Sequence, residues 1–120
     1  MIKFRAWDKE TKTMNGMAEI YRNRNQEMEL HPRDEEIILM QSTGLIDKDG
    51  QEVFEGDILG VETDEGTVNV NVFWDNTHAL YMFESKRYNE KDALGELVGD
   101  YACPFKVIGN IYENPKLLEE

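Results

Sequence analysis

Asp47, Asp49 and Gly50 have the residue types of a calcium-binding loop. In an EF-hand loop glycine occupies the sixth place, so Gly50 would put Leu45 first and Gly56 twelfth. Leu45 has no side-chain oxygen, and Gly56 cannot supply the bidentate carboxylate that the twelfth place requires. The segment is therefore predicted to be an ordinary turn, in which aspartate accepts backbone hydrogen bonds and Gly50 supplies a positive φ.

His31, His78 and Cys103 are all the histidine and cysteine of the chain. Zinc is held by about four protein ligands at a structural site, or three at a catalytic one. These three residues are far apart, and no two have the spacing of a ligand pair. We expect no metal site and no cofactor. The single cysteine excludes an intrachain disulfide.

Ser42, Ser85 and Cys103 are the candidate nucleophiles, and one of the histidines would have to act as the base. Neither serine has a nucleophile-elbow sequence around it. Cys103 lies between Ala102 and Pro104, without the neighbouring positive charge that stabilises a thiolate. There is no glycine-rich phosphate loop. We predict no catalytic residue; an unrecognised hydrolase is a remote alternative that rests only on the density of carboxylates.

Four aromatic residues could form a platform on which the bases of single-stranded nucleic acid stack. They are Phe73, Trp74, Tyr81 and Phe83. Adjacent residues of a strand face opposite sides, so Trp74 is expected in the core with the preceding valines. Phe73, Tyr81 and Tyr88 are expected outside. Only Lys86 and Arg87 accompany them, which favours a core or protein-interface role over base stacking.

The chain is strongly acidic, and its charge is unevenly distributed. The formal charge is −12, from 25 acidic and 13 basic residues. Residues 1–30 hold six basic and five acidic side chains, a net +1, which leaves −13 for residues 31–120. Direct binding of nucleic acid is disfavoured, because it depends on lysine and arginine displacing counterions. The only clustered candidates for it are Lys9, Lys12, Arg22 and Arg24.

An N-terminal hairpin is predicted from period-two alternation in Ile2–Trp7 and Met14–Tyr21, which flank a polar turn. Gly16 is expected to mark a β-bulge or a close approach of the backbone. Asn23–Glu29 is polar and is predicted to be a loop.

The middle of the chain is predicted to alternate short strands with tight turns. Ile37–Met40 reads as a strand that residues 42–44 end. After the turn at residues 47–50, Val53 and Phe54 are expected in the core.

Four further strands are predicted in the second half. They are Ile58–Thr63, Thr67–Asp75, Leu80–Glu84 and Lys106–Tyr112. Asp64–Gly66 is expected to form a three-residue hairpin loop, and Asn89–Leu94 the start of a helical turn. Asn114 is expected to cap a short terminal helix whose first residue is Pro115. Short strands joined by small turns indicate an antiparallel barrel of SH3-like type.

Three segments carry a resemblance to a known family. They are Met1–Asp8, Val107–Pro115 and the central run of Ser-Thr-Gly-Leu at 42–45, Asp47 with Gly50, and Phe-Glu-Gly-Asp-Ile at 54–58. With them the chain closely resembles the YopX-like family, small proteins carried by bacteriophages and prophages. The resemblance implies a mainly β protein, with an N-terminal β hairpin subdomain (about 1–50) packed beside a C-terminal SH3-like antiparallel barrel (about 51–120) in a single domain, 1–120. It implies no reaction.

The preferred hypothesis is a phage-derived, non-enzymatic accessory protein that binds another protein, and also a second copy of itself, through the β surface of its barrel. The alternative is a nucleic-acid-linked protein, either a weak binder through the N-terminal basic patch or an acidic mimic of DNA. No signal peptide or membrane span is expected, because charged residues interrupt every apolar run, so we predict a cytoplasmic protein of the bacterial host cell.

Overall fold

The computed structural model describes residues 3–18, 21–22, 28–29, 37–98 and 103–119. The chain divides into two compact units, Met1–Ser42 and Thr43–Glu120. The single-domain assignment, with subdomains at about 1–50 and 51–120, stays a prediction.

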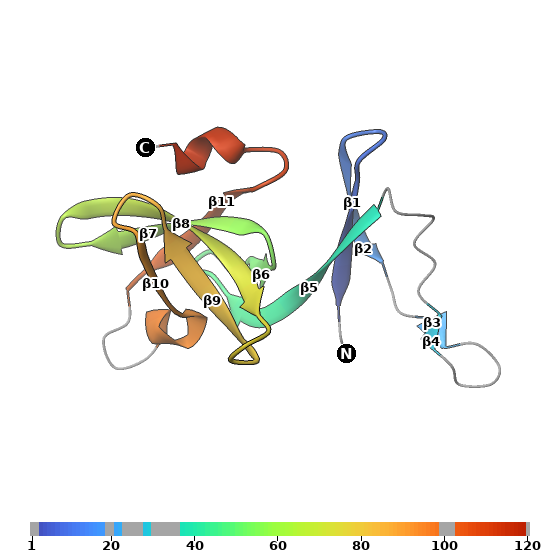
Figure 1. Ribbon diagram of the computed structural model, residues 1–120, viewed down its shortest axis with the longest axis horizontal. Coiled ribbons are helices and arrows are strands. Elements are labelled where there is room, and N and C mark those ends of the chain that lie inside the picture. Colours follow the sequence, from blue (N-terminus) through green and yellow to red (C-terminus); the bar gives the residue numbers. More distant parts are fainter. Residues whose placement is uncertain (1–2, 19–20, 23–27, 30–36, 99–102, 120) are drawn as a thin grey trace. The chain divides into compact units, whose positions relative to one another are not determined.

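The first unit contains the predicted N-terminal hairpin. Strands β1 (Phe4–Asp8) and β2 (Thr13–Ala18) pair antiparallel (Figure 1). Their register shifts between Phe4 and Ala6. The shift leaves extra backbone in β2 around Gly16, as predicted, because glycine costs little where a strand must bulge.

Two short paired strands follow the hairpin, and the second of them falls within the region predicted to be a loop. β3 (Tyr21–Arg22) pairs antiparallel with β4 (Met28–Glu29). The loop prediction is therefore wrong at residues 28–29, and residues 23–27 lie outside the described part of the chain.

Strand β5 (Ile37–Ile46) is longer than predicted. Its residues 37–41 pair antiparallel with β1. Ser42, Thr43 and Gly44 do not end it, although Gly44 has a φ of +84°. Thr43 instead donates its hydroxyl to the carbonyl of Val53, 2.8 Å away in the neighbouring strand, so cross-strand bonding overrides the local turn preference.

The second unit is built on a five-stranded antiparallel sheet that curves into a half-barrel (Figure 1). Its strand order is β10-β9-β8-β7-β11. The strands are β7 (Asp57–Thr63), β8 (Gly66–Asp75), β9 (Leu80–Ser85), β10 (Glu90–Ala93) and β11 (Phe105–Asn110). Strand β6 (Glu52–Phe54) neighbours β5. The predicted mainly β class is confirmed.

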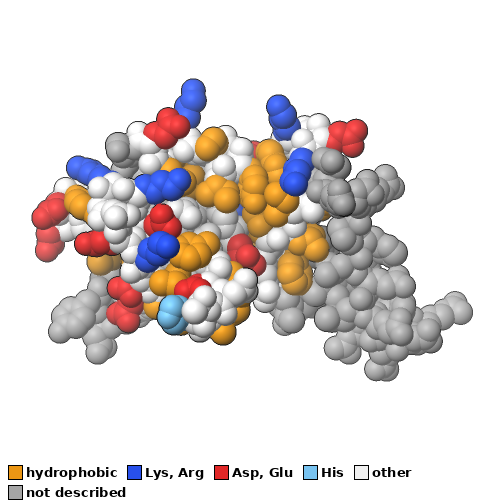
Figure 2. Space-filling view, in the orientation of Figure 1, with side chains coloured by type: hydrophobic (Ala, Val, Ile, Leu, Met, Phe, Trp, Pro, Cys, Tyr) orange, Lys and Arg blue, Asp and Glu red, His pale blue; other side chains and the backbone are white. Residues whose placement is uncertain are grey.

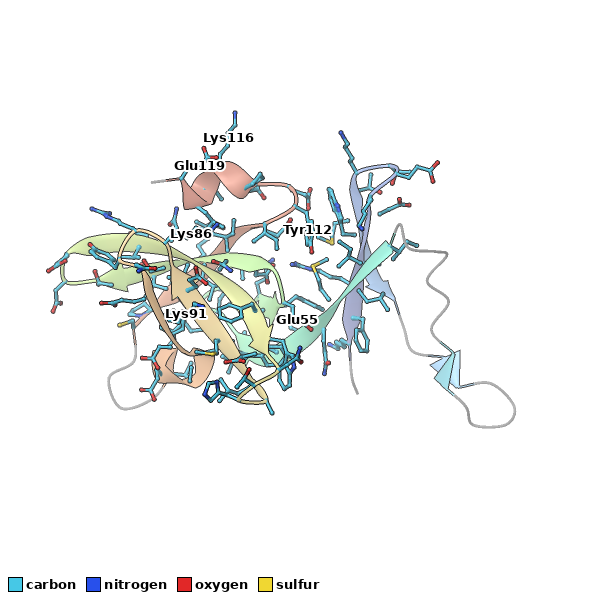
Figure 3. All side chains as sticks on the ribbon, in the orientation of Figure 1. Glu55, Lys86, Lys91, Tyr112, Lys116 and Glu119 are labelled. Carbon is cyan, nitrogen blue, oxygen red and sulfur yellow. The ribbon has the colours of Figure 1, made fainter. Side chains whose placement is uncertain are left out.

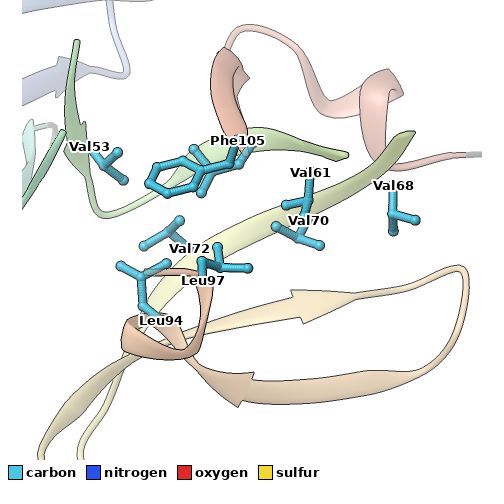
Figure 4. Close-up of a cluster of buried hydrophobic side chains, with 9 residues drawn as sticks. Val53, Val61, Val68, Val70, Val72, Leu94, Leu97 and Phe105 are labelled. Carbon is cyan, nitrogen blue, oxygen red and sulfur yellow. The ribbon is translucent and has the colours of Figure 1, made fainter. Parts of the chain in front are cut away.

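The core of this unit lies on the concave face of the half-barrel (Figure 4). Its buried members are Val53, Leu59, Val61, Val68, Val70, Val72, Leu94, Leu97 and Phe105. The three alternating valines of β8 point inward together because strand side chains alternate with period two. Val53 and Phe54 are buried as predicted.

Trp74 is not in the core, contrary to the prediction. It follows Val72 on the same face of β8, but 41% of it is exposed. Its ring instead meets Tyr81 edge to face, with centroids 4.9 Å apart, and its indole N–H donates to Asn76. The alternation is correct, but the last residues of β8 extend past the side chains that cover the core.

Local predictions at three connections need correction. Thr63 pairs directly with Gly66, so the hairpin loop contains two residues. Residues 90–93 form strand β10 because they pair with β9, and a 3₁₀ helix follows at Leu94–Leu97.

A second 3₁₀ helix spans Pro115–Leu118, with proline in its first turn as predicted. Asn114 makes no side-chain cap bond; its Oδ1 accepts from the N–H of Asn110 at 3.2 Å.

The Asp47–Gly50 turn is confirmed, and it also covers the outer edge of β11. Asp47 Oδ1 accepts from the N–H groups of Asp49 (2.9 Å) and Gln51 (2.7 Å), and Gly50 has a φ of +86°. Asp47 Oδ2 accepts from the N–H of Val107 at 2.9 Å. One buried carboxylate therefore closes the turn and ties it to the last strand.

Asp47 should make stability depend on pH in the acid range. Burial by itself raises the pKa of this carboxyl, but three backbone N–H donors and nearby Lys106 outweigh that effect and lower the pKa below its ordinary value. A lowered folded-state pKa stabilises the fold above the unfolded-state pKa of about 3.9, and this contribution is lost as pH falls through the folded value. Urea unfolding of wild type and of Asp47→Asn should therefore give free energies of unfolding whose difference is constant from neutral pH down to about pH 5. The difference should shrink below about pH 4. A difference that grows on acidification would contradict the assignment.

Candidate functional site

A cavity of about 430 Å³ opens on the concave side of the half-barrel. It forms because the two hairpins of the sheet diverge. Strand β8 pairs with β7 along Gly66–Asn71, but with β9 only along Asn71–Asp75. The tips of the β7–β8 and β9–β10 hairpins are therefore free to separate, and the cavity lies between them.

The cavity floor is apolar and belongs to the core. It consists of Val61, Val68, Val70 and Phe83. Apolar surface on a cavity floor favours an apolar ligand group, since filling the cavity removes that surface from water.

The rim of the cavity is acidic. Asp64 and Glu65 form the tip of one hairpin, and Glu90 begins β10 on the other. No lysine or arginine lines the cavity among the described residues. Carboxylates above an apolar floor favour a ligand that combines an apolar group with a positive charge.

Tyr88 forms one wall of the cavity. Its hydroxyl lies 3.5 Å from Glu65 Oε2, the outer limit for a hydrogen bond, and its N–H donates to the buried Ser85 hydroxyl at 3.2 Å. The Arg87 guanidinium lies over the Tyr88 ring, 5.4 Å from its centroid, without lining the cavity. Tyrosine in a partly open wall suits a binding surface, because its ring contributes apolar contact and its hydroxyl a polar one.

The histidines and cysteine considered for metal or catalysis lie apart from this cavity. His78 is exposed in the β8–β9 turn, where its Nδ1 is 2.7 Å from Asp75 Oδ2; this hydrogen bond lowers the pKa of Asp75. Cys103 is half-buried against the core. His31 lies outside the described residues. In the described ranges no three His, Cys, Asp or Glu side chains are grouped to hold a metal ion.

The serine candidates and the described residues of the basic patch lie on several different elements, and Ser85 ends β9 and lines the cavity. Ser42 lies in β5, where its N–H donates to the carbonyl of Lys3. Lys9 and Lys12 are exposed in the turn of the β1–β2 hairpin. Arg22 is in β3, and Arg24 lies outside the described residues.

The three aromatic residues expected outside the core differ in their surroundings, and the prediction is wrong for Tyr81. Tyr81 packs against the core. Burial is the main cause that raises the pKa of its hydroxyl, and the carboxylate of Glu55, which is labelled in Figure 3, adds to this effect. Phe73 follows the inward Val72 and so faces the opposite side of the sheet. The ammonium of Lys91, which is labelled in Figure 3, lies 5.9 Å from the Phe73 ring centroid. Tyr88 alone lines the cavity. The face drawn in Figure 2 shows acidic and basic side chains interspersed with apolar ones.

Sequence reasoning did not identify this cavity. Val68 and Val70 of its floor were predicted only as core and Phe83 only as a possible stacking residue, and Glu65 and Glu90 were counted among many carboxylates. The available signal was the acidic tip Asp64-Glu65 beside inward-facing valines. That β9 ends at Ser85, and so leaves part of β8 uncovered, is not readable from local pattern.

Comparisons with known proteins are consistent along the whole chain. A family model described as YopX protein matches residues 3–119. The crystal structure of protein EF1440 from Enterococcus faecalis is similar, with a TM-score of 0.69, 26% sequence identity and coverage of 98% of both chains. The crystal structure of protein yopX from Bacillus subtilis has a TM-score of 0.63 and 16% identity, with coverage of 97% of both chains. No curated protein matches. Among the described residues, no helix has the length and apolar character to cross a membrane.

Proposed function

Because this chain belongs to the YopX protein family, we propose that it is a phage or prophage accessory protein that acts by binding another protein, without catalysis, through the cavity between the two hairpin tips. The occupant is a partner segment that places an apolar side chain on the valine floor and a positive charge beside the carboxylate rim.

The shape and lining of the cavity carry this proposal. Its floor is apolar, its rim carries three carboxylates, and a tyrosine that is 41% exposed forms one wall. Protein interfaces are enriched in aromatic anchors at their centres, and a polar rim around an apolar centre is their usual arrangement. The chain's net charge of −12 adds long-range attraction for a basic partner.

Tyr88→Ala should weaken partner binding by at least about tenfold, because the truncation of a central interface aromatic typically costs more than 1 kcal/mol. The tagged protein is captured from phage-infected or lysogenic host cells, its stoichiometric partner is identified, and the dissociation constant is measured with both proteins purified.

Trp74→Ala is the matched control, because Trp74 is also 41% exposed on β8 but lies outside the cavity. It should retain the partner. A wild-type protein that elutes as a lone monomer, or a partner that Tyr88→Ala retains at full affinity, would contradict the proposal. Urea unfolding of both variants checks that each is folded.

A further inference from the structure

Part of strand β8 has an open backbone edge inside the cavity. Residues 66–70 of β8 pair with β7 on one side, whereas pairing with β9 begins only at Asn71. On the β9 side, the described part of the chain places no strand beside these residues. Backbone groups on that edge are therefore available to a further strand.

The other two edges of the sheet are protected, which sets this one apart. β10 is an outer edge with the sequence Glu-Lys-Asp-Ala, and charged side chains discourage pairing with another chain. The outer edge of β11 is covered by the Asp47 turn, through Val107 N–H to Asp47 Oδ2 and Lys48 N–H to the carbonyl of Phe105. The open stretch of β8 reads Gly-Thr-Val-Asn-Val, with neither charge nor proline.

We propose, on the basis of the proposed function, that the partner inserts an extended segment of alternating apolar and basic residues, which adds as a β-strand to the edge of β8 along residues 66–70. Main-chain hydrogen bonds to β8 hold the segment, and its alternate side chains reach the cavity floor because strand side chains alternate in direction.

The alternation of residue types follows from the two surfaces that the added strand meets. Inward side chains contact Val68 and Val70, so they are apolar. The flanking side chains lie near Asp64, Glu65 and Glu90, so lysine or arginine is preferred. The Tyr88–Glu65 contact that bridges the two tips is exposed and 3.5 Å long, and it is easily displaced.

The test uses the full chain, labelled with ¹⁵N, and three end-blocked peptides. The first is Lys-Val-Lys-Val-Lys-Val, the second has glutamate in place of each lysine, and the third is the lysine peptide N-methylated at every backbone amide, which cannot donate to β8 from either edge. Amide chemical shifts and hydrogen exchange are followed at residues 66–70, and at Lys91–Ala93 of the charged edge as an internal control.

The lysine peptide should slow amide exchange within residues 66–70 at least about tenfold at saturation and leave Lys91–Ala93 unchanged. The glutamate and N-methylated peptides should each bind at least about tenfold more weakly. Glu65→Gln should weaken the lysine peptide, whereas Glu96→Gln, an exposed carboxylate in the 3₁₀ helix after β10, should not.

Two failures are distinguishable. If the partner depends on Tyr88 but the lysine peptide protects none of residues 66–70, or binds equally well when N-methylated, strand addition is wrong and the proposed function stands. If the peptide protects these amides but partner binding ignores Tyr88→Ala, the proposed function is wrong and the strand-accepting edge stands.

Discussion

Asp47→Asn should lower the free energy of unfolding by about 3 kcal/mol, because it disturbs a buried carboxylate bonded to three backbone N–H groups. The substitution is nearly isosteric, but the new amide has a single oxygen. If that oxygen stays with Asp49 and Gln51, the amide N–H₂ group faces the N–H of Val107, and two donors are opposed in a buried place. Urea unfolding at neutral pH measures the change.

Asp49→Asn is the matched control two residues away. Asp49 is exposed, and its carboxylate lies 3.6 Å from the Lys106 ammonium in a surface ion pair. Such pairs contribute little, so the change in unfolding free energy should stay within about 0.5 kcal/mol. An equal loss of unfolding free energy in the two variants would show that the hydrogen bond from Val107 N–H to Asp47 contributes nothing beyond the effect of local charge.

Gly109→Ala should destabilise the protein by about 2 kcal/mol, because the Asn114 side chain leaves no space for a methyl group beside β11. A Cβ at this position would lie 2.5 Å from Asn114 Oδ1, 2.7 Å from its Cγ and 2.9 Å from its Cβ. Rotation of the Asn114 side chain cannot relieve the last of these contacts. The Asn114 N–H also donates to the carbonyl of Asn110 at 2.8 Å, which holds its backbone in place. Urea unfolding again gives the measurement.

Two variants separate this crowding from a general effect of alanine. Gly95→Ala, where a Cβ meets nothing within 4 Å, should change stability little or raise it by about 0.5 kcal/mol. Asn114→Gly removes all three crowding atoms, so Gly109→Ala should cost at least about 1 kcal/mol less in that background. Strict additivity of the two substitutions would contradict the crowding.

Much of the fold was predictable because it depends on local pattern. The inward valines of β8 follow from period-two alternation, and the Asp47–Gly50 turn from the side-chain acceptor and the freedom of glycine at positive φ. The N-terminal hairpin with its bulge at Gly16 follows from the same rules.

The errors occur where distant residues compete with local preference. β5 continues through Gly44 because neighbouring strands supply its hydrogen bonds. Residues 90–93 form a strand because β9 offers a pairing edge. The position of Trp74 on β8 was predictable, but its exposure depends on where the covering side chains end.

The candidate site shows the same division. Sequence alone indicated no metal-ligand spacing and no nucleophile motif, and it placed acidic residues at a hairpin tip. It could not show that β9 leaves β8 after Asn71, which opens both the cavity and the free edge.

By itself, the sequence determined which residues alternate, which turn and which carry charge, since these properties are set by neighbours a few positions apart. Only the tertiary structure decided that Asp47 holds the N–H of Val107, 60 positions away, and that two hairpin tips diverge over a valine floor. The physical reason is that such contacts depend on the path of the whole sheet, which no single segment specifies.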